Sequence, residues 1–313
     1  MHRNKSEPLL KAKFIEPNLP KTSPIAVFSH DAGGAYYLAK LIKNLENTLN
    51  IDFFISGPAQ EIFLRELNEE KYKPFKFKTL KQFDKQYYKL ILTGSGWASD
   101  HELNGLQIAK ENDIYSITLV DHWVNYRRRF TRRNSLFLPN QIWVVDDFAY
   151  DIAKKEFSRN KVLINLVRDP IRSEITKLKQ VVEEEDRILY ITEPIASTGK
   201  MTRSSQETKM SEKDALNKFV SLMTKLNDHT QVSVRVHPSE DIDDYKKKFD
   251  ELNFSINFTQ EPDPLVDIIR SRYVVGLESV MLVWALMANK RTFTLLPING
   301  RVCGLPHFGI ENI

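Results

Sequence analysis

The feature of this sequence that most restricts its fold is an alternation of short apolar runs with segments of helical periodicity. Short runs rich in β-branched and aromatic residues indicate buried strands, and apolar positions spaced three and four apart indicate helices. Strands that alternate with helices form a parallel sheet covered on both faces, so an α/β fold is expected. In the first half of the chain, strands are predicted at residues 25–29, 51–56, 89–93, 115–120, 141–145 and 161–166, and helices at 35–42, 59–67, 103–110 and 150–157.

The same pattern restarts after a charged stretch. Between residues 167 and 185 the composition shifts to charged side chains, and we expect a domain boundary there. Beyond it, strands are predicted at 187–192, 230–236, 254–258, 273–275 and 291–295, and helices at 212–226, 243–252, 265–270 and 279–287, with a turn-rich end at 297–313. The predicted organisation is a flexible lead-in at 1–23, an N-terminal Rossmann-like domain at 24–170, a C-terminal Rossmann-like domain at 184–313, and a cleft between the two domains.

The composition excludes several classes of protein. Hydrophobic residues make up 42% and charged residues 27%, as in ordinary globular domains. Cys303 is the only cysteine, which rules out an intramolecular disulfide. Neither a membrane-spanning apolar run nor a signal peptide is evident, so we expect a cytoplasmic protein. The net charge of +4 is too small to argue for nucleic acid, but it suits an anionic ligand or peripheral association with the inner face of the membrane.

The most informative stretch of the second half is residues 232–240. Its β-branched run predicts a strand, at the end of which Arg235 and His237 lie on the same face. Pro238 has no N–H to donate and stops the ladder. Ligands of open α/β sheets bind beyond the carboxyl ends of the strands, where a cation and an imidazole suit a phosphate. The alternative is a surface arginine and a histidine that satisfies a backbone carbonyl.

A comparable strand end follows residues 273–275. There the chain turns at Gly276 and a helix is predicted to start near Ser279, whose hydroxyl and neighbouring N–H groups could bind a phosphate. Glu278 beside it could hold ribose hydroxyls. Plain N-capping by Ser279 is the alternative, and capping and phosphate binding are compatible at one site.

In the first half, the candidate chemistry also follows strands. His30 and Asp31 come directly after the first strand, and Asp31 could take a proton from an acceptor hydroxyl. Gly33 and Gly34 would let backbone N–H groups approach a ligand at a helix N-terminus. The alternative is a tight glycine turn with Asp31 as a helix cap.

Two further strand ends contribute candidates. Asp121 and His122 follow the strand at 115–120, so Asp121 is the rival to Asp31 as the base. Trp97 follows another glycine turn and could stack on a sugar face, although a core tryptophan is the alternative. The loop after Asp121 is rich in arginine, which would suit an anionic glycan or a phosphorylated lipid, or simply form a solvated charged loop. Its cationic side chains are Arg127, Arg128, Arg129, Arg132 and Arg133.

Together these stretches resemble the GT-B glycosyltransferase superfamily. Arg235-Val-His-Pro238 is similar to the His-Pro motif of bacterial sialyltransferases and capsule or teichoic-acid polymerases, and Gly276-Leu-Glu-Ser279 to the serine motif of the same enzymes. The resemblance implies two Rossmann-like domains of GT-B type, and it implies that His237 and Ser279 contact donor phosphate or ribose. The acidic-acidic-Gly motif of sialyltransferases is not evident, because Asp146-Asp147 is followed by Phe148.

The function implied is a metal-independent, inverting glycosyltransferase that moves a sugar from a CMP- or UDP-type donor to a surface-polysaccharide or glycolipid acceptor. It needs no cofactor and no nucleic-acid partner, and the oligomeric state is left open. The expected catalytic residues are Asp31, His30 and Asp121. The expected nucleotide-sugar-binding residues are Arg235, His237, Pro238, Gly276, Glu278 and Ser279. The expected acceptor-binding residues are Gly33, Gly34, Trp97, His122, Arg127 and Arg128.

Two alternatives stay open. A nucleotide-sugar 2-epimerase shares this fold, needs acid and base groups at the donor ring, and would turn over the donor without an acceptor. A non-catalytic protein could instead bind an anionic polymer through the arginine-rich loop, with an affinity that falls as salt rises.

Overall fold

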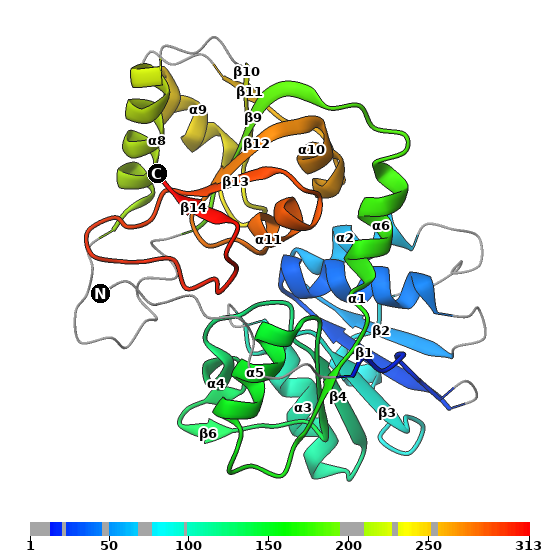
Figure 1. The fold of residues 1–313 in the computed structure, drawn as a ribbon. Helices are drawn as coiled ribbons and strands as arrows, with labels where there is room; N and C mark the ends of the chain where they lie inside the picture. Colours follow the sequence, from blue (N-terminus) through cyan, green and yellow to red (C-terminus); the bar gives the residue numbers. More distant parts are fainter. Residues whose placement is uncertain are drawn as a thin grey trace. The chain divides into compact units, whose positions relative to one another are not determined.

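The computed structural model describes residues 13–20, 23–45, 50–67, 77–96, 99–194, 210–226, 231–251 and 256–313. The chain divides into two compact units, Met1–Ile171 and Arg172–Ile313 (Figure 1). Each unit contains a six-stranded sheet whose strand pairs are all parallel. The alternation in the sequence therefore predicted the fold class correctly. Two predicted features, Trp97 and nearly all of the polar loop at 196–210, lie outside the described residues.

The sheet of unit 1 has the order β2-β1-β3-β4-β7-β8. Its strands are β1 (Ile25–Ser29), β2 (Ile51–Ile55), β3 (Leu90–Thr93), β4 (Tyr115–Leu119), β7 (Gln141–Val144) and β8 (Leu163–Leu166). The chain moves from β1 to β2 on one side and then crosses to β3 on the other side, so the order reverses between β1 and β3. Ligands of such sheets bind at this switch point, beyond the carboxyl ends of the strands.

The four predicted helices of unit 1 are present, and three of them begin two or three residues earlier than predicted. The helices of this unit are α1 (Ala32–Asn44), α2 (Ala59–Glu66), α3 (His101–Glu111), the short α4 (Tyr126–Arg129) and α5 (Asp147–Glu156). The sequence pattern missed α4 and the hairpin of β5 (Thr131–Arg132) and β6 (Ser135–Leu136), because elements of two to four residues are too short to show a period. The predicted arginine-rich loop is therefore partly ordered as a helical turn and a hairpin.

Unit 2 has the strand order β11-β10-β9-β12-β13-β14. Its strands are β9 (Glu185–Ile191), β10 (Gln231–Arg235), β11 (Asn257–Phe258), β12 (Ser271–Gly276), β13 (Arg291–Thr294) and β14 (Ile310–Asn312). Its helices are α8 (Glu212–Leu226), α9 (Ile242–Glu251), α10 (Pro264–Arg270) and α11 (Val280–Met287). The order reverses between β9 and β12, which makes this pair the switch point of unit 2.

Two differences from the sequence prediction concern unit 2 and the stretch before it. The charged stretch contains a helix, α6 (Pro170–Leu178), and the turn-rich end contains the strand β14, which pairs in parallel with β13. Ser211 caps α8, since its Oγ accepts a hydrogen bond from the Asp214 N–H at 3.2 Å. In the core of this unit, apolar faces of α8 and α9 pack against the sheet, and the rings of Tyr190 and Phe219 are stacked with their centroids 4.3 Å apart.

No helix in the described part of the chain is long and apolar enough to cross a membrane.

Candidate functional site

The switch point of unit 2 brings together the ends of three adjacent strands. Thr192 and Glu193 follow β9, His237 follows β10, and β12 ends at Gly276. Thr192 connects two of these ends, because its Oγ1 accepts the His237 N–H at 2.9 Å and donates to Glu240 Oε2 at 2.6 Å. The three loops are thus held together by hydrogen bonds.

Glu193 follows β9 at this switch point, and the sequence indicates a carboxylate at a strand end there without indicating its use. Its Oε1 accepts the backbone N–H groups of Leu277 at 3.1 Å and of Glu278 at 2.7 Å. Burial raises the pKa of Glu193 to about 7, and the nearby Glu278 carboxylate adds to the effect. The carboxyl group therefore joins β9 to the loop before α11 and titrates near neutral pH.

The His237 side chain is fixed in one tautomer by its own loop. Its Nδ1 accepts the Ser239 N–H at 3.1 Å and lies 2.8 Å from Ser239 Oγ. Because Nδ1 acts as an acceptor, the proton of the neutral ring is on Nε2. His237 therefore presents an N–H donor at the end of β10, as a phosphate contact would require. Pro238 follows in the same turn, which closes with the Glu240 N–H bonded to the His237 carbonyl at 2.8 Å.

The loop between β12 and α11 supplies the second donor group. Ser279 is the N-cap of α11, and its Oγ accepts the Met281 N–H at 3.2 Å, so the expected capping is confirmed. Ser279 and Val280 stand at the start of α11, where the first backbone N–H groups of a helix have no intrahelical acceptor. Glu278 differs from the expectation, because its carboxylate bonds the Gly304 N–H and pairs with Arg301 at 3.2 Å. Its charge is partly compensated there, which weighs against the expected contact with ribose.

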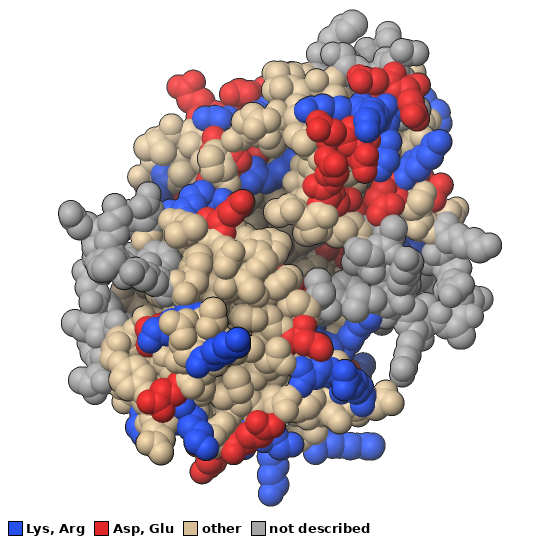
Figure 2. Space-filling model, turned by 180° about the vertical axis from the view of Figure 1, so that it is seen from behind, with Lys and Arg blue, Asp and Glu red and all other residues tan. Residues whose placement is uncertain are grey.

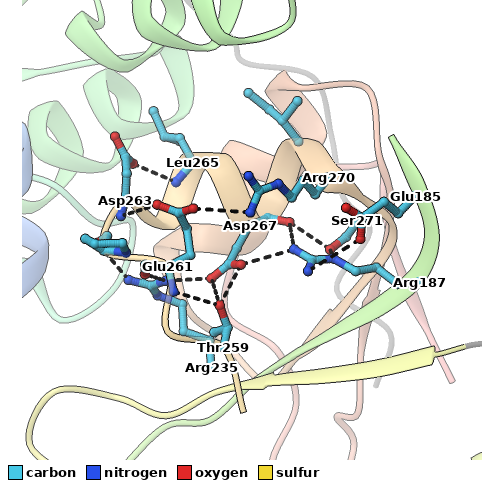
Figure 3. A network of polar contacts seen from close by, with 12 residues as sticks. Glu185, Arg187, Arg235, Thr259, Glu261, Asp263, Leu265, Asp267, Arg270 and Ser271 are labelled. Atoms are coloured by element: carbon cyan, nitrogen blue, oxygen red, sulfur yellow. Dashed lines mark hydrogen bonds and ion pairs between the residues drawn. The ribbon is translucent and has the colours of Figure 1, made fainter. Parts of the chain in front are cut away.

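Arg235 also differs from the expectation, as Figure 3 shows. Its guanidinium donates to Asp267 Oδ2 at 2.6 Å and to the carbonyls of Glu261 and Pro262 at 2.7 and 3.1 Å. Asp267 is fully buried and pairs on its other side with Arg187 at 3.1 Å. The positive charge of Arg235 is therefore compensated inside the unit, and we assign it a structural role rather than the expected phosphate contact.

At the switch point of unit 1, the first strand ends in an ordered imidazole–carboxylate pair. His30 Nδ1 lies 3.0 Å from Asp31 Oδ1, and this hydrogen bond raises the pKa of His30. Asp31 occupies the N-cap position of α1, but its side chain makes no cap hydrogen bond. The alternative of a simple helix cap is therefore wrong for the side chain. The His30 and Asp31 N–H groups bond instead to Glu102 Oε1, at 2.6 and 3.4 Å.

Glycines allow this close arrangement, but they are not the expected ones. Gly33 and Gly34 lie inside the first turn of α1 rather than in a loop before it. A Cβ on Gly34 would meet its nearest neighbour, Ser95 N, at an ordinary 3.4 Å, so the packing of α1 against the loop after β3 does not require a glycine there. A Cβ on Gly96 would lie 2.6 Å from Asp31 Cγ, and one on Gly57 would lie 2.5 Å from His30 Nε2. The backbone at these two positions therefore packs directly on the pair.

Asp121, at the end of β4, is buried with a basic partner. It is 6% exposed, accepts a hydrogen bond from Ser95 Oγ at 2.8 Å, and lies 3.6 Å from the Arg129 guanidinium. Arg129 also donates to the Ser95 carbonyl at 2.6 Å. Burial raises the pKa of Asp121, and the Arg129 charge opposes this shift. Arg129 therefore belongs to the interior, not to a surface patch.

The remaining arginines of the loop have separate environments. Arg127 is exposed and lies 3.5 Å from Glu156, Arg128 is partly buried, and Arg132 donates to Asn104 Oδ1 at 2.6 Å. Figure 2 shows basic and acidic side chains interspersed on the face in view. Arg129 is buried and Arg127 has an acidic neighbour, so fewer free cationic side chains are exposed than the expected surface for an anionic polymer requires.

His122 has the same tautomer as His237. Its Nδ1 accepts the Trp123 N–H at 3.0 Å, and Trp123 Nε1 donates to the Asp146 carboxylate at 2.8 Å. Asp146 in turn caps α5 through the Ala149 N–H. Within the described ranges, no group of three or more His, Cys, Asp and Glu is placed to hold a metal ion.

Comparisons with known proteins identify the fold. No family model matches the sequence, and none of the curated proteins does. Among solved structures, the chain is similar to the UDP-GlcNAc 2-epimerase of Methanocaldococcus jannaschii in complex with UDP-GlcNAc and UDP (TM-score 0.62, 13% identity, 93% of this chain and 88% of that chain). It is also similar to S. aureus MnaA with UDP (TM-score 0.63, 11% identity, 89% of this chain and 81% of that chain).

A third similar structure is the UDP-GlcNAc 2-epimerase of Neisseria meningitidis bound to UDP-GlcNAc (TM-score 0.59, 14% identity, 89% of this chain and 84% of that chain). The chain therefore has the GT-B fold with two Rossmann-like domains, which confirms the expected fold class. At these identities the likeness concerns the fold alone. None of these three structures is a sialyltransferase, so that narrower resemblance stays a prediction.

Proposed function

We propose that this protein is an enzyme that acts on a nucleotide sugar, with epimerisation at C2 of the sugar as its reaction. The observation that carries this proposal is the set of acid and base groups at the switch point of unit 1. Asp31 and His30 form a hydrogen-bonded pair there, and the carboxyl groups of Glu102 and Asp121 have raised pKa values. When a base removes the C2 proton, the electron pair forms a C1–C2 double bond and the nucleoside diphosphate leaves C1. The diphosphate then adds back to C1 while an acid protonates C2 on the opposite face, so the reaction needs one base and one acid, and such a set provides both.

In this proposal, unit 2 binds the nucleotide. The Nε2–H of His237 and the N–H groups of Ser279 and Val280 are donors at neighbouring strand ends, as a diphosphate requires. These groups belong to a fold that the chain shares with UDP-GlcNAc 2-epimerases crystallised with UDP-GlcNAc, in one case together with UDP. We therefore favour UDP among the donor nucleotides. The cleft that the resemblance implies between the domains stays a prediction.

In unit 1, Asp31 is our first candidate for the base. Its side chain is partly exposed, and its neighbour His30 stabilises the carboxylate. Asp121 is more buried and its raised pKa favours the protonated form, so we propose it as the acid that returns the proton. Each role follows from the environment of the carboxyl group rather than from its position in the sequence.

A glycosyltransferase is the second candidate function. The His30–Asp31 pair favours it, because a carboxylate that orients an imidazole is also a suitable base for the hydroxyl of an acceptor. In that case a glycan or glycolipid acceptor would bind to unit 1, and a lipid-linked acceptor would bring the enzyme to the membrane surface.

Incubation of the protein with UDP-GlcNAc in D₂O, without an acceptor, tests the proposal. An epimerase that exchanges the C2 proton with solvent should produce the C2 epimer with deuterium at C2, detectable by NMR and mass spectrometry. Asp31→Asn and Asp121→Asn should each lower the rate by 10²-fold or more, a typical effect for an acid–base group (on the order of 10²–10⁴). If the donor stays unchanged by itself and is consumed only after an acceptor glycan is added, the result would favour the transferase instead.

A further inference from the structure

Glu102 is a buried acid to which the sequence pattern assigned no role. It lies in the first turn of α3 and is 2% exposed. Its Oε1 accepts the N–H groups of two consecutive residues of the β1–α1 turn, His30 at 2.6 Å and Asp31 at 3.4 Å. A residue seventy positions away in the sequence thus fixes the backbone of the imidazole–carboxylate pair.

The other oxygen of the same carboxyl group is in a different situation. Glu102 Oε2 is buried and has no hydrogen-bond partner among the described residues. A charged carboxylate with a bare oxygen away from water is costly, so burial favours the neutral form. Burial, together with the negative charge of Asp31, raises the pKa of Glu102 to about 7.

The three side chains act on one another. Asp31 raises the pKa of both neighbours, His30 through a hydrogen bond and Glu102 through its charge, and the charge of Glu102 raises the pKa of His30 as well. The other titratable groups around them are His101, on α3, whose ring lies 6.5 Å from that of His30, and Asp121 at the end of β4. Groups coupled in this way do not titrate independently.

We propose that Glu102 is a positioning residue that shares one exchangeable proton with the His30–Asp31 pair, so that the three side chains work as a single acid–base unit. The inference about catalysis rests on the proposed function, whereas the sharing of the proton is a property of the protein alone. In the reaction, Glu102 would not touch the substrate. It would hold the turn in place and set the charge of the pair that does.

The coupling is measurable by NMR without any substrate. The ring signals of His30 are followed against pH in the wild type and in Glu102→Gln, whose amide oxygen can still accept the two N–H groups. Removal of the negative charge should lower the midpoint of His30. Asp100→Asn is the control, because Asp100 is at the start of the same helix but its side chain is 59% exposed and screened by solvent. It should leave the midpoint of His30 unchanged.

A reciprocal measurement covers the case in which Glu102→Gln does not fold. The carboxyl ¹³C signal of Glu102 should titrate near pH 7 in the wild type and at a lower pH in Asp31→Asn, because the charge that raises it is gone. A midpoint of Glu102 near 4.5, or one that Asp31→Asn does not move, overturns the proposal, as does an unchanged His30 midpoint in folded Glu102→Gln.

The test of the proton sharing is separate from the test of the proposed function. Coupled titration without turnover of UDP-GlcNAc would contradict the proposed function and would still support the sharing of the proton. Where turnover occurs, the basic limb of its pH profile should move with the His30 midpoint in Glu102→Gln.

Discussion

At the scale of single residues, Glu193 shows how an internal carboxylate can influence an anionic ligand. Its Oε1 bonds the N–H groups of Leu277 and Glu278, next to the donors that we assign to the nucleotide phosphate. The pKa of Glu193 is raised to about 7 by burial, so the group is mostly neutral at pH 6 and mostly charged at pH 8. A negative charge at this position repels a diphosphate.

We therefore expect the affinity for UDP to fall between pH 6 and pH 8 more steeply in the wild type than in Glu193→Gln. The amide oxygen of glutamine still accepts both N–H groups but stays neutral at every pH, so the variant should bind UDP more tightly at pH 8, by about tenfold for each 1.4 kcal/mol of repulsion removed. Isothermal titration calorimetry measures the affinity of both proteins for UDP. The titration of UDP itself affects both in the same way, so it cancels when the two pH profiles are compared. Parallel pH profiles would show that Glu193 exerts no such charge effect.

A second prediction at this scale concerns the two glycines after β3, Gly94 and Gly96. A Cβ at Gly96 would overlap Asp31, whereas a Cβ at Gly94 would meet its nearest neighbour, Ser29 Oγ, at an ordinary 3.4 Å. Gly96→Ala should therefore displace the Asp31 carboxylate and lower turnover by 10²-fold or more, an effect typical of a misplaced catalytic group (on the order of 10²). Gly94→Ala should keep most of the activity. Equal activities of the two variants in the deuterium-exchange assay would argue against Asp31 as the base.

At the scale of elements, the network in Figure 3 attaches α10 to the sheet of unit 2. Asp267 on α10 is fully buried and pairs with Arg187 on β9 and Arg235 on β10, and its carboxylate also accepts the Thr259 hydroxyl at 2.8 Å. The buried acid compensates two arginines on adjacent strands. Its removal takes the fully buried counter-charge away from both guanidinium groups, although Arg187 keeps Glu185 at 3.8 Å.

We expect Asp267→Ala to lower the free energy of unfolding of unit 2 by about 3–5 kcal/mol, the usual cost of removing one partner of a buried ion pair. Asp263→Ala is the matched change at the same helix, because Asp263 caps α10 through the Leu265 N–H at 2.9 Å. That variant should lose about 1 kcal/mol. Urea denaturation followed by circular dichroism measures both, and similar losses would mean that the network contributes no more than a cap.

Elements of ordinary length were predictable from the sequence, and the short ones were not. The strand β9 and the helix α8 carry enough apolar positions for their period to be visible. In contrast, α4 and the β5–β6 hairpin are formed within the arginine-rich loop, where Arg129 turns inward to Asp121 and Ser95. A run of arginines gives no sign of which one will be buried, since that depends on an acid supplied by another strand.

At the scale of the whole molecule, each unit has its own parallel sheet and its own switch point. The donors that we assign to the nucleotide all belong to unit 2, as does a core built from α8, α9 and the strands around β9. A fragment that begins at Arg168, before α6, should therefore fold and bind UDP by itself. Its affinity should fall at least tenfold in the His237→Ala version, the loss expected for one charge-assisted hydrogen bond (about 1.5–3 kcal/mol). A folded fragment without affinity for UDP would place essential donors in unit 1.

The sequence by itself determined the class of fold and the places where chemistry could occur. Apolar periodicity is a local property that records which face of a segment is buried, and the residues after each strand follow directly from it. His30, Asp31, Asp121 and His237 were found in this way. The tertiary structure alone decided the partners of these residues. Glu102 and Glu193 meet them from distant segments, and Arg235 is neutralised by an acid on α10, because such contacts exist only after the strands have assembled into sheets.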